Sequence, residues 1–181
     1  MSNSIPAALH APESPSTPLD RDMLENVVRL SRKSPRKRII QRLHGPDNAP
    51  LQRMLNAMQP GSYLRPHRHQ HPPKAETFVM LTGAVRYISF DDQGTITQVL
   101  DMRAGSTVFG VDIEPGVWHS LMVLEPDSVV FETKNGPYEQ ASDKDFAPWS
   151  PAEGDPETSA YLSELEKRSD RFLARSAERR G

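Results

Sequence analysis

Histidines gather in one short stretch of this sequence, which reads HRHQH from residue 67 to residue 71. Imidazoles at alternate positions of an extended chain project to the same face, because side chains alternate across a strand. Glu76 follows this stretch, and His119 comes later, after a Pro115-Gly116 turn. Three or four of these nitrogen and oxygen donors can bind one metal ion, provided that separate strands bring them together.

The absence of cysteine narrows this chemistry further. Thiolate ligands, disulfides and cysteine nucleophiles are excluded, so a metal must be held by nitrogen and oxygen. Such ligands suit one divalent transition metal ion (Fe, Mn, Ni, Co or Zn) and do not choose among these metals. Three imidazoles and one carboxylate would leave one or two positions open for water or a substrate.

Glycines around the histidines add two spaced motifs. The first reads G-x5-H-x-H and then E-x6-G, and the second reads G-x4-PG-x2-H, with the residues Gly61, His67, His69, Glu76 and Gly83, then Gly110, Pro115, Gly116 and His119. Both resemble the two motifs of the cupin superfamily. This resemblance implies that His67, His69, Glu76 and His119 are the metal ligands. The sequence departs from the family pattern in the longer gap between His69 and Glu76, and it lacks the Asn that often follows the second-motif histidine.

The longer gap leaves two interpretations of the histidine pair. His67 and His69 keep the family's spacing from Gly61, whereas His69 and His71 restore the usual gap to Glu76. We expect the first pair, because the turn at Gly61 determines where the strand enters the barrel, while the two prolines after His71 can be absorbed in a loop. His71 would then lie near the rim, free of the ion.

Longer stretches resemble the WbuC family of cupin metalloproteins, over roughly residues 20 to 163. They read LQRMLNAMQPGSYLRPHRH, ETFVMLTGAVRYISFDDQG, EPGVWHSLMVLEPDSVVFETKNGPY and DKDFAPWSPAEGDPE. The resemblance implies an all-β core of the cupin type, a double-stranded β-helix or jelly-roll barrel, with flanking N- and C-terminal helices. That family is associated with O-antigen and other surface-polysaccharide gene clusters, which implies a sugar or sugar nucleotide as the ligand.

The sequence pattern favours the same fold class. From residue 51 to residue 130, short runs of β-branched and aromatic residues alternate with turn residues, as is typical of a β-sandwich or barrel. The run from Asp92 to Gly94 predicts a hairpin turn between strands at 85–90 and 96–100. Apolar residues on both faces of 76–82 predict that this strand is covered on each side, by a terminal helix or a second subunit.

Helical spacing appears at both ends. Asp20 is the expected N-cap of a helix that stops at Ser34-Pro35, and a second helix is expected from Pro156 or Glu157 to near Ala174. The tail from 175 to 181 is expected to fray.

These patterns divide the chain into four parts. We expect a disordered tail at 1–19, an N-terminal helical segment at 20–46, the cupin β-barrel at 47–150, and a C-terminal helix and tail at 151–181. The first 20 residues lack the basic start and apolar stretch of a secretory signal.

Charge and hydropathy limit the partners. The net charge is −2, and no apolar run approaches the roughly 20 residues that span a bilayer. We therefore expect a cytoplasmic protein with no nucleic-acid or membrane partner. Residues 29–42 hold seven basic residues and no acidic one, which form either a solvated face or a surface that meets an anion. His10 and His44 lie outside every motif and are expected at the surface.

Four further residues are candidates for substrate chemistry. Tyr63 and Arg65 have the same parity as His67, so Tyr63 is a candidate catalytic proton donor and Arg65 a ligand of a substrate carboxylate or phosphate. Glu132 and Lys134 alternate with apolar or uncharged neighbours on the last strand. They are expected to line the mouth of the barrel, Glu132 as a catalytic proton carrier and Lys134 as a substrate-binding residue.

Two classes of function fit these candidates. The first is a metal-dependent enzyme, such as an isomerase or epimerase, a lyase or an oxygenase, that acts on a small polar and in some cases anionic molecule. The alternative is a non-catalytic metal-containing module that binds a small ligand. In either case we expect a homodimer, because the strand at 76–82 and the terminal helices offer surfaces to a partner.

Overall fold

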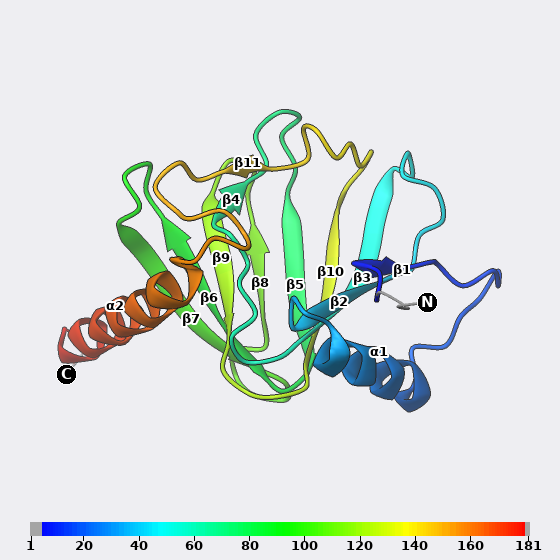
Figure 1. Ribbon diagram of the computed structural model, residues 1–181, viewed down its shortest axis with the longest axis horizontal. Coiled ribbons are helices and arrows are strands. Elements are labelled where there is room, and N and C mark those ends of the chain that lie inside the picture. The colour runs from blue at the N-terminus through cyan, green and yellow to red at the C-terminus, as the bar shows by residue number, and fades with distance from the viewer. Residues whose placement is uncertain (1–4, 180–181) are drawn as a thin grey trace.

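Two β-sheets packed face to face form the body of the protein, with one helix on each outer side (Figure 1). The computed structural model describes residues 5–179. One sheet has the strand order β1-β2-β3-β10-β5-β8, and the other has the order β11-β4-β9-β6-β7. All neighbouring strands are antiparallel except the β1–β2 pair. The expected cupin-type jelly-roll barrel with flanking helices is confirmed.

The strands are short, between two and eight residues long. The larger sheet consists of β1 (Ala8–Leu9), β2 (Arg38–Arg42), β3 (Leu51–Met58), β10 (Ser128–Asn135), β5 (Glu76–Thr82) and β8 (Gly110–Ile113). The smaller sheet consists of β11 (Asp145–Phe146), β4 (His67–Arg68), β9 (Trp118–Val123), β6 (Ala84–Phe90) and β7 (Ile96–Arg103).

Alternation along each strand sends one set of side chains between the sheets. Phe78 on β5, Tyr87 on β6 and Leu121 on β9 belong to the central apolar cluster, together with Met58 and Val130. Full burial of each large apolar side chain contributes about 1.5–3 kcal/mol. This cluster joins the inner faces of the two sheets.

The hairpin between β6 and β7 is formed as expected. Asp91 begins the turn, and its side chain accepts hydrogen bonds from the backbone N–H groups of Gln93 at 2.9 Å and Thr95 at 2.8 Å. Gly94 takes the positive φ of +79° that this turn needs.

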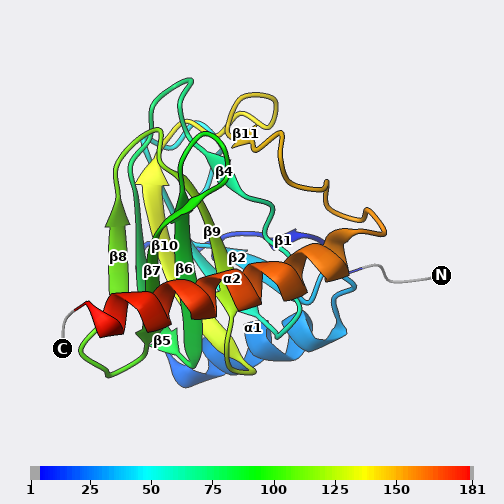
Figure 2. The same cartoon turned by 90° about the vertical axis from the view of Figure 1, so that its left-hand side faces the viewer.

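The two helices cover different sheets (Figure 2). α2 (Thr158–Glu178) packs Leu165 and Phe172 on the outer face of the smaller sheet, so β6 and β9 are buried on both faces. α1 (Arg21–Lys33) packs Val27 against Ile39 and nearby residues of the larger sheet. The N-cap is Asp20 as expected, since its side chain accepts a hydrogen bond from Met23 N–H at 3.0 Å. Within residues 5–179, neither helix has the length and apolar character to cross a membrane.

The ends of the chain depart from the sequence expectation in three places. The predicted disordered tail contains β1, and the predicted N-terminal helical segment contains β2, which continues the larger sheet. Both strands owe their order to backbone pairing with the sheet, which a local pattern does not reveal. α2 continues to Glu178 across part of the tail that was expected to fray, while 1–4 and 180–181 lie outside the described residues. The division into four parts stays a prediction.

Neither helix covers the outward face of β5. Leu81 is 36% exposed there, and Phe109, which precedes the neighbouring β8, is 54% exposed. A terminal helix therefore does not supply the cover that the two-sided apolar pattern of this strand predicts.

Gly83 makes the tightest connection in the barrel, as the single residue between β5 and β6. Its φ is +69°, and a Cβ added there would lie 2.4 Å from Ser128 Oγ and 2.9 Å from Ser128 Cα. Backbone strain and overpacking add up, so Gly83→Ala is expected to lower the free energy of unfolding by about 2–5 kcal/mol. Urea denaturation measures this change.

Gly105 offers the matched control for that substitution. Its φ of +71° is nearly the same, but no atom lies within 4 Å of an added Cβ. Gly105→Ala therefore carries the strain alone, about 1–2 kcal/mol. Equal losses in the two variants would show that the approach to Ser128 is unimportant.

Candidate metal centre

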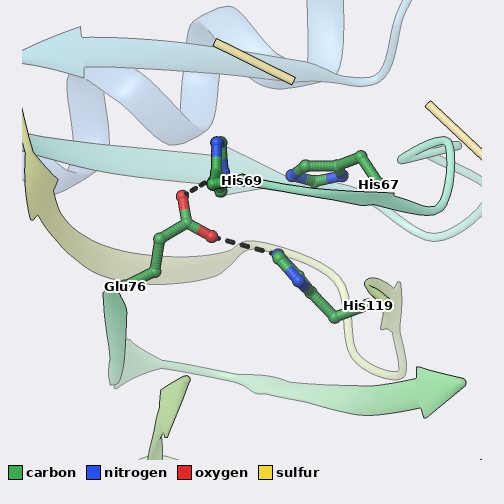
Figure 3. A group of neighbouring side chains, drawn as sticks. All are labelled: His67, His69, Glu76 and His119. Atoms are coloured by element: carbon green, nitrogen blue, oxygen red, sulfur yellow. Dashed lines mark ion pairs between the residues drawn. The ribbon is translucent and has the colours of Figure 1, made fainter. Parts of the chain in front are cut away.

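Three histidines and one glutamate converge between the two sheets (Figure 3). His67, His69, Glu76 and His119 each offer one ligand atom, and these atoms lie within 4.8 Å of one another. All four side chains are buried. The cluster is the set of four ligands that the cupin resemblance implies.

Strand pairing brings these residues together from distant positions. β4 pairs with β9 so that His67 lies directly opposite His119. Glu76 begins β5 in the other sheet, and its side chain lies on the inner face of that strand with Phe78 and Met80. The site therefore joins both sheets of the barrel.

Backbone carbonyl groups orient all three imidazoles. Nδ1 of His67 lies 3.0 Å from the carbonyl oxygen of Arg65, Nδ1 of His119 lies 2.9 Å from that of Val117, and Nδ1 of His69 contacts the carbonyl oxygen of Asp143. A carbonyl oxygen only accepts, so each Nδ1 carries the proton and donates it. Each Nε2 is left with a free lone pair, as in histidines that bind metals.

The lone pairs face other acceptors, which indicates that a cation belongs among them. His69 Nε2 lies 3.0 Å from Glu76 Oε1, and His119 Nε2 lies 3.0 Å from Glu76 Oε2. Among the described residues, these two nitrogens and Glu76 Oε2 have no hydrogen-bond partner. Buried acceptors that face one another are unfavourable unless a positive charge lies between them. The donor set therefore fits a divalent transition metal ion.

The ionisation of the cluster suits a metal as well. Burial, with the positive charge of Lys144, lowers the pKa of His67 well below its usual value, so this imidazole is neutral. Burial alone would raise the pKa of Glu76, but its surroundings, including the positive charge of Lys134, hold it well below its usual value. Metal ligands must be deprotonated, and the lowered pKa values of His67 and Glu76 both favour that state.

A buried network of charged side chains contacts the cluster at Glu76. The Asp143 carboxylate binds Lys74 Nζ at 2.7 Å and Lys134 Nζ at 2.8 Å. Lys134 Nζ also lies 3.6 Å from Glu76 Oε1, which connects the network to the candidate ligand. Asp143 and Lys74 were not predicted from the sequence, because no motif spacing connects them to the histidines.

A cavity of about 620 Å³ lies next to the cluster, and strands β2, β3, β5 and β10 of the larger sheet contribute to its lining. His67 and Glu76 line it, and so do Arg65, Glu132 and Lys134. Burial raises the pKa of Glu132, and the negative charge of Glu76 adds to this effect. Asn56 Nδ2 donates a hydrogen bond to Glu132 Oε2 at 2.5 Å. The structure thus brings three of the four expected substrate-contacting residues to the cavity.

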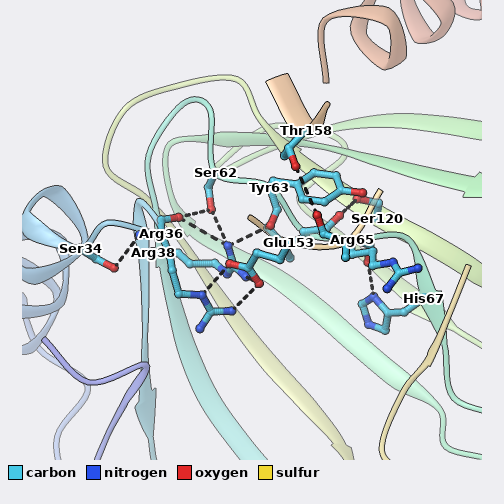
Figure 4. A network of polar contacts seen from close by, with 12 residues as sticks. Ser34, Arg36, Arg38, Ser62, Tyr63, Arg65, His67, Ser120, Glu153 and Thr158 are labelled. Carbon is cyan, nitrogen blue, oxygen red and sulfur yellow. Dashed lines mark hydrogen bonds and ion pairs between the residues drawn. The ribbon is translucent and has the colours of Figure 1, made fainter. Parts of the chain in front are cut away.

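Tyr63 is the fourth, and it does not line this cavity (Figure 4). Its hydroxyl donates a hydrogen bond to the carbonyl of Pro151 at 2.8 Å, and its ring lies edge-on to Tyr161. Equal parity with His67 does not bring Tyr63 to the cavity, because residues 62–66 form no strand and their side chains need not alternate.

Two other histidines can now be placed. The side chain of His71 is 81% exposed and lies outside the cluster, with Nδ1 3.9 Å from Asp145 Oδ2. This agrees with the pair His67 and His69. His44 is buried, which contradicts its expected surface position, because its Nδ1 contacts the backbone of Arg53.

Carboxylates from elsewhere in the chain neutralise much of the basic stretch 29–42. Arg36 and Arg38 both bind Glu153 at 2.7 Å, as Figure 4 shows. Arg32 pairs with Asp127, and Arg42 pairs with Asp47. Part of this stretch, including Arg36, Arg38 and Arg42, lines the outer end of the cavity.

Comparisons with known proteins give a family model and several similar folds. A model described as a domain of unknown function (DUF6016) matches residues 19–102. No curated protein matches the sequence. The structural neighbours are cupin-fold proteins.

Three solved structures illustrate this similarity. A tryptophan-to-phenylalanine variant of oxalate decarboxylase from B. subtilis is 20% identical with a TM-score of 0.43, and the match covers 53% of this chain and 24% of that chain. KdgF from Halomonas sp. is 16% identical with a TM-score of 0.45, over 57% of this chain and 83% of that chain. The capsular polysaccharide assembling protein CapF from Staphylococcus aureus is 21% identical with a TM-score of 0.46, over 59% of this chain and 28% of that chain.

Proposed function

We propose that this protein is a metal-dependent enzyme that acts on a small polar molecule held in the barrel cavity. The observation that carries the proposal is the set of three imidazoles whose Nδ1–H groups are taken by carbonyls, so that their free nitrogens surround one buried carboxylate. His67, His69, Glu76 and His119 would hold one divalent ion. When bound, such an ion polarises a carbonyl or hydroxyl oxygen at an open coordination position.

Glu132 is the residue best suited to move a proton in this cavity. Burial and the nearby Glu76 raise its pKa, which makes its carboxylate a stronger base than an ordinary exposed glutamate. Asn56 occupies one oxygen of the carboxylate, and Lys134 Nζ lies 3.8 Å from the other. These two contacts orient the carboxylate, while Arg65 is placed to bind an anionic group of the substrate.

The size of the cavity and the resemblance to the WbuC family indicate the substrate class. A cavity of about 620 Å³ falls in the range of small-ligand pockets, roughly 300–1,000 Å³. We further propose a WbuC-type protein that acts on a sugar or sugar nucleotide in surface-polysaccharide metabolism, and the sequence stretches quoted above support this proposal. Proton transfer by Glu132 favours an isomerase, epimerase or lyase over an oxygenase.

Elemental analysis with an activity panel tests the proposed function. The purified protein is expected to hold close to one equivalent of a divalent transition metal per chain and to turn over one member of a panel of sugars and nucleotide-sugars. Glu132→Gln is expected to keep the metal and to slow that turnover by about 10²–10⁴-fold, the usual contribution of a general base.

Two outcomes would count against this assignment. A protein that has no metal and takes up none would refute the site itself. A loaded protein that binds members of the panel without turnover would instead support the non-catalytic binding module.

We also propose that the protein is a homodimer, with the exposed apolar face of β5 and β8 at the interface. Sedimentation at micromolar concentration is expected to give about twice the chain mass of 20.3 kDa. Leu81→Ser, at a position that is 36% exposed, is expected to shift the protein toward monomer by removing apolar area from this face. A wild-type protein that sediments as a monomer would contradict the proposal.

A further inference from the structure

The segment between β10 and α2 lines part of the cavity beside the histidine cluster. This segment, the strap (residues 137–157), runs from β10 to α2 and contains β11 (Figure 1). It pairs with β4 and hydrogen-bonds to the barrel through Ala147 N–H, which donates to the carbonyl of Pro66 at 2.9 Å. The strap contributes Lys144 and Phe146 to the cavity lining.

Lys144 is a half-buried cation without a partner of its own. It lines the same cavity as His67 and Glu76, and within residues 5–179 its ammonium group forms no ion pair and no hydrogen bond. Burial lowers the pKa of Lys144, and the positive charge of Lys134 adds to this effect. A cation that has lost water without gaining an anion is unfavourable, so an anionic ligand placed beside it would bind favourably.

Arg65 presents a second unpaired cation to the cavity. The strap orients its guanidinium group, since Nη2 donates to the carbonyls of Ala147 at 3.1 Å and Ser150 at 3.3 Å. Phe146 lies against it, with the ring centroid 5.1 Å from Cζ. Among the described residues, Arg65 has no carboxylate partner and Nη1 donates to no acceptor, so this nitrogen remains available to a ligand.

The charge around the cluster is positive even before a metal is counted. Four cationic side chains surround or line this end of the cavity, and three carboxylates face them, namely Lys74, Lys134, Lys144 and Arg65, against Glu76, Glu132 and Asp143. Asp143 forms ion pairs with both Lys74 and Lys134, but among residues 5–179 no carboxylate pairs with Lys144 or Arg65. A bound divalent metal ion would increase this excess of positive charge.

We propose that Lys144, together with Arg65, binds a carboxylate or phosphate group of the substrate beside the metal cluster. Phe146, half of whose surface is exposed at the mouth, offers an apolar face to the ring that carries this group. The substrate is therefore an anionic sugar derivative rather than a neutral sugar. This inference rests on the proposed function, because it concerns the ligand of the same cavity.

Calorimetric titration with simple probes tests this inference. Glucuronate and inorganic phosphate represent the two sources of an oxyanion, and glucose is the neutral counterpart of glucuronate. We expect at least one anion to bind more tightly than glucose at fixed ionic strength. Lys144→Met is expected to weaken that binding by about 10–100-fold, the effect of losing one charged hydrogen bond, whereas Lys144→Arg keeps most of it.

A matched control separates the local cation from overall charge. Lys167 lies exposed on α2 and does not line the cavity. Lys167→Met removes the same charge and is expected to leave anion binding unchanged. If Lys167→Met and Lys144→Met weaken binding equally, or if neither anion binds more tightly than glucose, the proposal is wrong.

The same titrations on chelator-treated protein distinguish this inference from the metal proposal. Binding that depends on Lys144 in both treated and metal-loaded protein supports the anion site, whether or not the metal assignment holds. If anion binding is lost on removal of the metal and is unaffected by Lys144→Met, the anion binds to the metal ion alone. This result would overturn the inference. Binding of phosphate but not glucuronate would identify the substrate group as a phosphate, and the reverse result as a carboxylate.

Discussion

Replacing His119 by alanine is expected to weaken metal binding by more than about 100-fold, and His67→Ala is expected to do the same. Loss of an outer contact to a ligand already costs about 10–100-fold in metal affinity, so loss of a ligand itself costs at least as much. Both histidines are buried and held by carbonyls, so no other described side chain is placed to substitute for them. Competition with a chelator of known affinity measures the change.

His71→Ala is the control for both variants. It removes an imidazole from the same short stretch, but from a side chain that is 81% exposed and outside the cluster. Its metal affinity is expected to equal that of the wild type. A His71→Ala protein emptied of metal, beside a His67→Ala protein that remains loaded, would reverse the assignment of the ligands.

Asp143→Asn is expected to lower the free energy of unfolding by about 3 kcal/mol, because it leaves two buried ammonium groups short of a negative charge. The side chains of Asp143, Lys74 and Lys134 are 3%, 1% and 4% exposed, so solvent does not screen the loss. Urea denaturation of metal-free protein measures the effect without a contribution from the ion.

The exposed pair of Glu164 and Arg171 provides the comparison. These side chains are 54% and 57% exposed, and Glu164→Gln is expected to change stability by less than about 1 kcal/mol. If Asp143→Asn is no more harmful than Glu164→Gln, the buried network does not stabilise the fold.

The stability difference between wild type and Asp143→Asn should also depend on pH. Burial alone would raise the pKa of Asp143, but Lys134 and Lys74 hold it below its usual value. A carboxyl with a lowered pKa in the folded state contributes stability above its unfolded value, about 3.9, and that contribution is lost as the pH falls through the folded value. The two proteins should therefore converge in stability below about pH 4.

Local patterns in the sequence predicted the elements that their own residues determine. Asp20 marked the start of α1, Asp91 and Gly94 formed the expected hairpin turn, and the alternation in β5 placed Glu76 and Phe78 on one face. Spacing from Gly61 selected His67 and His69 over His71, because the turn at Gly61 determines where the chain enters the barrel.

Contacts between distant segments were beyond those patterns. Asp143 and Lys144 carry no spacing signal, since folding of the strap over the barrel brings them to the site, where Asp143 contacts Lys74. Tyr63 was misplaced because an alternation that holds within a strand was extended into a segment without one. β1 depends on its pairing with β2, and the residues of β1 alone do not indicate this pairing.

The carbonyl that accepts the hydrogen bond from His69 Nδ1–H belongs to Asp143, 74 positions further along the chain. All four candidate ligands therefore leave the ribosome before the strap that orients one of them. Synthesis proceeds from the N-terminus at about 5–20 residues per second, so a growing chain passes through a stage that has every ligand but an unanchored His69. Tight metal binding should then be acquired late, once the strap has docked, and a ribosome-bound chain stopped before residue 143 should exchange its metal freely.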